Sequence, residues 1–243
     1  MRPLLAQVRA ETWMTLRRGE TLLVTIGIPV VFLVFFSEVH VLPTGHESAV
    51  SFVVPGVLAL SVMSTAMVSL GIATGFERGY GVLKRLGTTP LRRDRLVGAK
   101  VITVVLVELA QAVVLIPVGL GLGWRPGGHG GAVGAAVAVA LLATVAFAGL
   151  GLALAGLLRA EVNLAAANGL YLVLLLLGGM LVPVSKLPAA LAAFARGLPA
   201  AALSGGLHAT LGAGGAVPGE SWVVLAIWAV CTPTLASLTF RWE

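Results

Sequence analysis

The sequence predicts an all-α integral membrane protein with six transmembrane helices. Hydrophobic residues make up 58% of the 243 residues and charged residues only 11%, and the mean hydropathy is +1.01. Soluble domains carry about 45–50% apolar and about 25% charged residues, and a soluble chain of this size lacks the interior to hide so much apolar surface. The composition therefore excludes the soluble globular and disordered classes.

Six long apolar stretches are expected to cross the bilayer, because a spanning helix needs about 20 apolar residues. Barrel strands alternate in polarity over about ten residues, whereas these runs are continuous and longer. Lipid offers the backbone no hydrogen-bond partners, so each run must be helical. The expected spans are residues 21–39, 50–74, 101–122, 131–158, 164–184 and 222–240.

Two further segments are apolar without being simple spans. Residues 1–20 are predicted to form an amphipathic helix at the inner membrane interface rather than a signal peptide, with Leu4 and Val8 on one side and Arg17 on the other. The plainer alternative is a positively charged topology anchor. Between the fifth and sixth expected spans, Pro188 and Pro199 interrupt a stretch whose alanine and leucine content argues against a fully solvated loop.

Lys and Arg residues set the expected orientation. With the N-terminus inside, 13 of them fall in cytoplasmic segments and 3 in outer segments, so the positive-inside rule places both termini in the cytoplasm. The same rule accounts for the net charge of +6 without nucleic acid as a partner. We therefore expect a multi-pass protein of the cytoplasmic (inner) membrane. Cys231 is the single cysteine, so no internal disulfide is expected.

The cytoplasmic connection 76–95 is strongly basic, yet it carries a small apolar face. Two glycines open it, and Gly87 and Pro90 end any helix between them. Val82, Leu83 and Leu86 would share one side of that short helix. A solvated loop has no need of such a face, whereas a helix docked on a cytoplasmic partner does. The alternative is that the basic residues only fix the topology.

Glu108 lies about eight residues into the third expected span, which places it ~12 Å deep and near the middle of the bilayer. An ionisable group there should face the bundle interior or a wet cavity. Gln111 is one turn further on the same face. Either the pair contributes to a translocation path or it makes interhelical hydrogen bonds that hold the fold.

Other polar residues in the spans have the same two interpretations. Ser61, Thr65 and Ser69 are spaced four residues apart on the second span, which permits close helix packing and also fits the lining of a path. Asn168 near the start of the fifth span is placed to face a partner helix. The four histidines lack metal-ligand spacing, and no metal site is predicted.

Several segments together resemble the ABC-2 type export permeases. The loop after the second span does so in the run Glu77-Arg78, Gly81, Leu83, Leu86 and Thr89-Pro90, followed by Lys100. The region before the last span does so in Asn168, Gly179-Met180, Pro183, Leu187-Pro188 and Leu198-Pro199, and the ending 240–243 is similar too. The resemblance covers the chain as a single ABC-2 type transmembrane domain, 1–243, and is nearest to the drug-exporting, daunorubicin-type branch.

The resemblance implies a coupling helix in the basic loop that rests on a separate ATP-binding subunit. It also implies short re-entrant or outer helices between the fifth and sixth spans. The residues at or beside the coupling contact would be Glu77, Arg78, Gly81, Leu83, Lys84, Arg85 and Leu86, with Thr89 and Pro90 forming the exit turn. The chain has Gly-Tyr-Gly at 79–81 where members often carry more rigid residues, so the start of the helix is left open.

The implied function is that of the permease subunit of an exporter for a drug, lipid-like or other amphipathic compound, with multidrug efflux and antibiotic resistance as its setting. No G-x-x-x-x-G-K-[ST] run occurs, so no cofactor is expected on this chain, and ATP and Mg²⁺ are expected on the partner ATPase. Six helices are too few for a closed, gated path, so a second permease chain is expected beside the ATPase and membrane lipids.

Two other classes remain open. A six-span secondary transporter would use Glu108 as its proton-coupled group, but it leaves the apolar face of the basic loop unexplained. An intramembrane enzyme needs a convergent set of nucleophile, base or metal ligands, and the sequence shows no such set. We therefore expect the chain not to be an enzyme.

Overall fold

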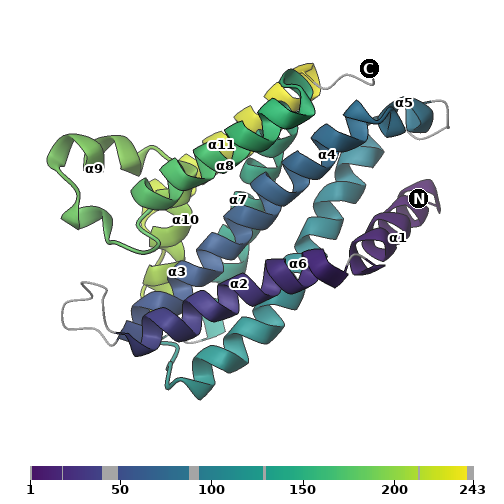
Figure 1. Ribbon diagram of the computed structural model, residues 1–243. Helices are drawn as coiled ribbons and strands as arrows, with labels where there is room; N and C mark the ends of the chain where they lie inside the picture. Colours follow the sequence, from purple (N-terminus) through teal and green to yellow (C-terminus); the bar gives the residue numbers. More distant parts are fainter. Residues whose placement is uncertain are drawn as a thin grey trace.

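The computed structural model describes residues 2–17, 19–39, 49–87, 93–127, 130–212 and 214–239, and these residues form helices without any strand (Figure 1). The all-α class is confirmed. The elements are α1 (Arg2–Arg17), α2 (Gly19–Glu38), α3 (Ala49–Met63), η1 (Ser64–Ser69), α4 (Leu70–Gly79), α5 (Val82–Gly87), α6 (Arg93–Gly121), α7 (Gly130–Leu157), α8 (Ala160–Leu177), η2 (Val184–Lys186), α9 (Ala189–Arg196), α10 (Pro199–Leu207), η3 (His208–Gly212) and α11 (Gly219–Thr239).

Helices long and apolar enough to cross a membrane dominate the described part of the chain. There are five: Ala49–Gly79, Arg95–Gly121, Gly131–Leu157, Ala160–Leu177 and Gly219–Thr239. A sixth crossing has two candidates, because the apolar part of α2, Leu23–Glu38, is shorter, and α9 and α10 form a pair bent by 86°. The protein is thus an all-α, multi-pass membrane protein, and the choice of the sixth crossing stays a prediction.

The second expected span is part of a single longer helix. α3, η1 and α4 run without a break from Ala49 to Gly79, and η1 is a π-helical turn in its middle. On the other side of the connection, α6 already begins at Arg93. Within the expected loop 76–95, the described residues 76–79, 82–87 and 93–95 are therefore helical. α4 extends to Gly79 because Glu77 and Arg78 near its end bind groups of the same chain.

The fifth expected span ends earlier than predicted, at Leu177 instead of residue 184. Gly178 and Gly179 follow, and Gly179 has a φ of 71°, in the left-handed region that favours glycine. A Cβ atom on Gly178 would come within 2.9 Å of the Cβ atom of Ala200. The chain then forms the short elements η2, α9 and α10, which confirms the prediction of short helices before the last span.

The centre of the bundle is α7, which packs closely against α11 and against the η1–α4 segment. Glycines allow this approach: a Cβ atom on Gly149 would lie 2.5 Å from the nitrogen of Pro233, and one on Gly151 would lie 2.5 Å from the carbonyl oxygen of Met67. Small residues at helix contacts are the usual route to tight packing in membranes, where hydrophobic burial adds little. Phe147 of α7 is completely buried in this core.

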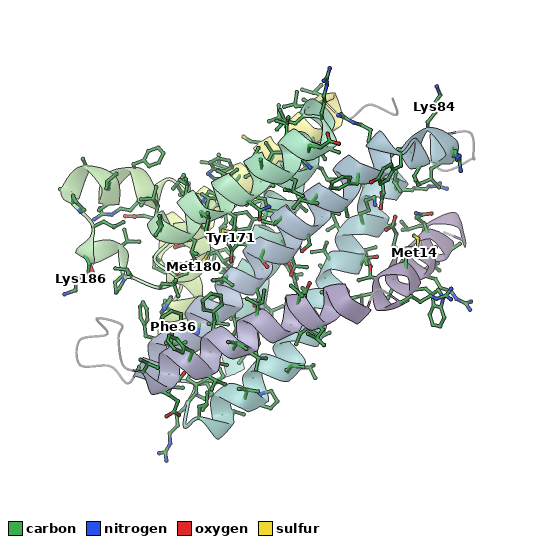
Figure 2. All side chains as sticks on the ribbon, in the orientation of Figure 1. Met14, Phe36, Lys84, Tyr171, Met180 and Lys186 are labelled. Atoms are coloured by element: carbon green, nitrogen blue, oxygen red, sulfur yellow. The ribbon has the colours of Figure 1, made fainter. Side chains whose placement is uncertain are left out.

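Two ends of the bundle can be told apart in Figure 1. α1 and α5 lie at one end, which we call the α5 end, and α9 lies at the other, which we call the α9 end. Lys84 of α5 and Lys186 of η2 mark the two ends in Figure 2. The residues predicted for coupling and those predicted for the path therefore occupy different levels of the bundle.

Candidate functional site

A tight turn joins α4 to α5. The backbone of Gly81 has a φ of 70°, which a residue with a Cβ atom adopts only at a steric cost. The amide of Gly81 donates to the carbonyl oxygen of Arg78 at 3.0 Å, and the amide of Arg85 donates to that of Gly81 at 3.2 Å. The turn thus fixes the start of α5 at Val82. Thr89 and Pro90, the predicted exit turn, lie outside the described residues.

The two faces of α5 have different surroundings. Leu83 is completely buried in the main hydrophobic core of its own chain, and Leu86 packs against that core. Val82 is 40% exposed, and Lys84 is exposed and points away from the bundle in Figure 2. Leu83 therefore anchors α5 to this chain and has no surface to offer a partner. The exposed face of α5 includes Val82, Lys84 and Arg85.

Arg78 binds the end of a neighbouring helix. Its guanidinium donates to the carbonyl oxygen of Gly156 and, at 2.5 Å, to that of Leu158, both at the C-terminal end of α7. The last carbonyls of a helix lack partners within it and carry partial negative charge, so an arginine there satisfies both needs. Arg78 thus ties α4 to α7, whereas the family resemblance implies a place for it at or beside the ATPase contact.

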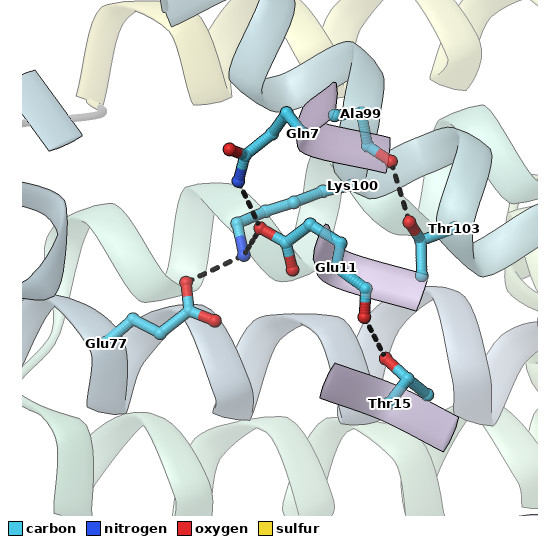
Figure 3. A network of polar contacts seen from close by, with 7 residues as sticks. All are labelled: Gln7, Glu11, Thr15, Glu77, Ala99, Lys100 and Thr103. Carbon is cyan, nitrogen blue, oxygen red and sulfur yellow. Dashed lines mark hydrogen bonds and ion pairs between the residues drawn. The ribbon is translucent and has the colours of Figure 1, made fainter. Parts of the chain in front are cut away.

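Glu77 also points inward, into a cluster of charges around Lys100 (Figure 3). Lys100 of α6, 2% exposed, places its Nζ atom 2.7 Å from Oε2 of Glu77 and 3.2 Å from Oε1 of Glu11. Gln7 donates to the same oxygen of Glu11 at 3.0 Å. Because a buried charge is costly unless it is paired and hydrogen-bonded, this arrangement holds α1, α4 and α6 in one relative position. We call Glu11, Glu77 and Lys100 the charge cluster.

A cavity of about 130 Å³ lies next to the charge cluster, between α1, α2, the η1–α4 segment and α6. Its wall is rich in charged and hydroxyl side chains: Glu11, Thr15, Thr25, Thr65, Ser69, Glu77, Lys100 and Thr103. The cavity extends the polar surface from the α5 end toward the middle of the bundle. Thr65 and Ser69, two members of the predicted polar stripe, face it.

Gln111 joins three helices in mid-bundle. Its Oε1 atom accepts from the hydroxyl of Thr65 at 3.3 Å, and its Nε2 atom donates to the backbone carbonyl of Thr25 at 2.9 Å. Thr65 belongs to η1, and π-helical turns often occur at functional sites. Ser61, the third member of the stripe, donates to the carbonyl of Val57 in its own helix at 2.9 Å. The interhelical interpretation therefore fits Gln111 and Thr65.

Glu108 has far fewer partners than the charge cluster. Thr144 of α7 donates to its Oε2 atom at 2.6 Å, while its Oε1 atom is buried and has no hydrogen-bond partner in the described part of the chain. Glu108, Ser61 and Gln111 line a second cavity, of about 180 Å³, between α3, α6 and α7. We call this the α6–α7 cavity.

The two asparagines of α8 lie on opposite sides of the helix. Asn168 is exposed, and its amide donates only to the carbonyl of Leu164 in its own helix, at 2.8 Å. Asn163 is completely buried and donates to the carbonyl of Gly71 at 2.9 Å. Asn168 thus faces outward from this chain, where a partner helix or lipid would meet it, and Asn163 holds α8 against α4.

Sequence reasoning missed Glu11, Lys100 and Thr144 as members of these contacts. Glu11 carried a signal, because on a helix it falls on the same side as Leu4 and Val8, where an acid needs a partner. The sequence pattern gives Lys100 a place among the topology charges and in the run that resembles the family, but it does not predict the ion pairs. In the structure, Glu77 and Arg78 each bind groups of the same chain. Lys84 and Arg85 of α5 are exposed at the surface of the α5 end.

Comparison with known protein families agrees with this architecture. The family model described as ABC-2 type transporter matches residues 4–211, which is most of the chain. No curated protein matches the sequence. The protein therefore belongs to the ABC-2 type transporter family and is a membrane-spanning domain of that family.

Proposed function

We propose that this chain is the permease subunit of an exporter that moves an amphipathic compound across the cytoplasmic membrane, driven by ATP hydrolysis on a separate ATP-binding subunit. Family membership and a bundle with membrane-spanning helices support the permease role. In this proposal ATP and Mg²⁺ bind to the partner, and this chain holds no catalytic residue.

The orientation supports a cytoplasmic partner at the α5 end. Of the 16 Lys and Arg residues, 13 belong to segments that the positive-inside rule assigns to the cytoplasm. α1 and α5 lie together at this end (Figure 1), and Lys84 projects from it (Figure 2). In this orientation α5 lies on the cytoplasmic side, where a soluble ATPase would bind.

The packing of α5 is the observation that carries the proposal. α5 exposes Val82 and Lys84, while the buried side chain of Leu83 packs α5 against the core of its own chain. The preceding helix α4 is tied to α7 by Arg78 and to α6 and α1 by the charge cluster. A displacement of α5 by the ATPase would thus be transmitted to several helices at once, as alternating access requires.

A second permease chain completes the proposed path. Asn168 is exposed on α8 although the helix is apolar enough to cross the membrane. A polar side chain in a span usually faces another helix or a wet cavity rather than lipid. We therefore expect α8 of one copy to face a second copy or a sister permease.

A second candidate function is a secondary transporter that uses Glu108 as its proton-coupled group. The mid-bundle position of Glu108 and its unpartnered Oε1 atom favour this alternative. The two candidates differ in their energy source. Transport that stops when ATP hydrolysis is blocked supports the exporter, and transport that stops only when the proton gradient is dissipated supports the alternative.

Co-purification with the candidate ATP-binding subunit tests the proposal. Val82→Asp places a charge on the apolar part of the outer face of α5, and we expect it to abolish co-purification, because a buried unpaired charge costs about 3–5 kcal/mol. Val82→Leu keeps the site apolar and serves as the matched control, which should behave like the parent. Equal co-purification of Val82→Asp and the parent would remove α5 as the contact.

A further inference from the structure

The α6–α7 cavity opens toward the lipid rather than toward the charge cluster. Its wall includes Leu109 of α6 and Val137 of α7, which are 56% and 51% exposed at the surface of the bundle. Leu207 of α10 and Leu211 of η3 also line it. Nearly all lining side chains are apolar, so a molecule that occupies it is for the most part apolar and arrives through the bilayer.

Among the described residues, one side-chain polar atom in this lining is buried without a hydrogen-bond partner. Ser61 donates to the carbonyl of Val57, and Gln111 is engaged by Thr65 and Thr25. The Oε1 atom of Glu108 is buried with no partner among the described residues. The cavity therefore presents a single unused hydrogen-bonding group, and that group is a carboxylate oxygen.

The other oxygen of Glu108 is only partly satisfied. The Thr144 hydroxyl lies 2.6 Å from Oε2 of Glu108 and 2.9 Å from the carbonyl oxygen of Ala140. A hydroxyl has one proton, so it serves one of these acceptors at a time. Lys100 forms ion pairs with Glu11 and Glu77, whereas Glu108 has no ion pair with a residue in the described part of the chain. A carboxyl group in apolar surroundings either takes up a proton or binds a cation, so a ligand cation that enters the cavity finds its counter-charge at Glu108.

We propose that the α6–α7 cavity binds the ammonium group of a lipophilic amine that enters from the bilayer, with Glu108 as its counter-charge. That the amine is also the exported compound rests on the function proposed above. An apolar cavity of about 150 Å³ holds benzene, so about 180 Å³ holds the ammonium group and the adjoining apolar carbons. The remainder of the molecule would lie along Leu109 and Val137.

The depth of Glu108 excludes the headgroup of a membrane lipid as the source of the amine. Glu108 lies about 12 Å of helix from Lys100 on one side and about 20 Å from Gly121, the end of α6, on the other. Lipid headgroups stay at the bilayer surface, outside a hydrocarbon core of about 30 Å. The ligand is therefore a free lipophilic amine that partitions into the core.

Binding of radiolabelled dodecylamine to the full chain in phosphatidylcholine nanodiscs tests this site, with empty nanodiscs as the background. We expect saturable binding that unlabelled dodecanol, of the same length but uncharged, does not displace. Glu108→Gln removes the charge and keeps the shape, so the affinity should fall about tenfold or more. Glu161→Gln makes the same change at an exposed position and should leave binding unchanged.

Ala112→Leu provides a second variant, since it narrows the cavity and leaves Glu108 in place; it should also weaken binding. Displacement by dodecanol, undiminished binding to Glu108→Gln, or no binding above empty nanodiscs would overturn the site. The assay uses neither ATP nor the ATP-binding subunit. Binding without co-purification of the subunit would thus refute the exporter and retain the site, and the reverse result would refute the site alone.

Discussion

Lys100 and Glu108 lie eight residues apart on α6, about 12 Å along the helix, and the two regions around them are built differently. Lys100 is 2% exposed and pairs with Glu11 and Glu77 from two other helices. Glu108 has the shared hydroxyl of Thr144 and one unpartnered oxygen. A buried charge with several partners fixes helices in place, whereas one without them keeps its capacity for a ligand.

The largest loss of stability is expected from a substitution in the charge cluster. Lys100→Met leaves the buried carboxylate of Glu11 and the partly buried carboxylate of Glu77 near each other without a cation, so we expect a loss of about 3–5 kcal/mol of stability. Thermal unfolding of the purified chain in detergent measures it. Lys84→Met, the same change at the exposed surface of α5, is the control and should leave the unfolding temperature within experimental error of the parent.

An unchanged unfolding temperature in Lys100→Met would show that the charge cluster does not hold α1, α4 and α6 together. Lys100→Arg refines the result, because it keeps the charge in a planar group of different reach. Partial loss in Lys100→Arg beside severe loss in Lys100→Met would confirm that both the charge and its geometry matter.

A smaller loss of stability is expected where α5 packs against the core. Leu83→Ala removes a completely buried side chain and should cost about 2–5 kcal/mol. Val82→Ala, at the neighbouring position that is 40% exposed, should change stability by about 0.5 kcal/mol or less. Denaturant titration of both variants compares the two faces of α5 directly. Equal losses would contradict the assignment of Leu83 as the internal anchor and Val82 as the outer contact.

The smallest effect on stability is expected at Glu108, in contrast to Lys100. Glu108→Gln replaces an incompletely partnered acid by a neutral amide that still accepts from Thr144, so stability should stay within about 0.5 kcal/mol or rise. The same unfolding assay gives the answer. A loss comparable to that of Lys100→Met would mean that Glu108 is a structural residue, and the contrast between the two regions would disappear.

The helices themselves follow from the sequence, because long apolar runs in lipid have no alternative to helical structure. Their ends do not follow as well. The second expected span continues to Gly79, since Glu77 and Arg78 find partners on α6 and α7 that lie far away in the sequence. The local composition predicts that these residues are loop charges. The sequence near them gives no sign of their partners, which lie on other helices.

The candidate site was predicted in part for the same reason. The basic loop with a short apolar helix was expected, and α5 is that helix. Which of its apolar residues turns inward depends on how α5 packs against the core, so the sequence pattern alone predicts Leu83 as a contact for a partner although it is buried in its own chain. Likewise the stripe Ser61, Thr65 and Ser69 divides between two cavities, because a π-helical turn changes the spacing of the helix face.

Photo-crosslinking at the α5 end tests the central claim, that α5 docks on a separate ATP-binding subunit. A photoreactive phenylalanine analogue placed at Val82, in membranes that contain both subunits, should yield an adduct with the ATP-binding subunit. The same analogue at Arg125, which lies between α6 and α7 at the opposite end, should yield none. An adduct at Arg125 and none at Val82 would contradict both the orientation and the coupling role of α5.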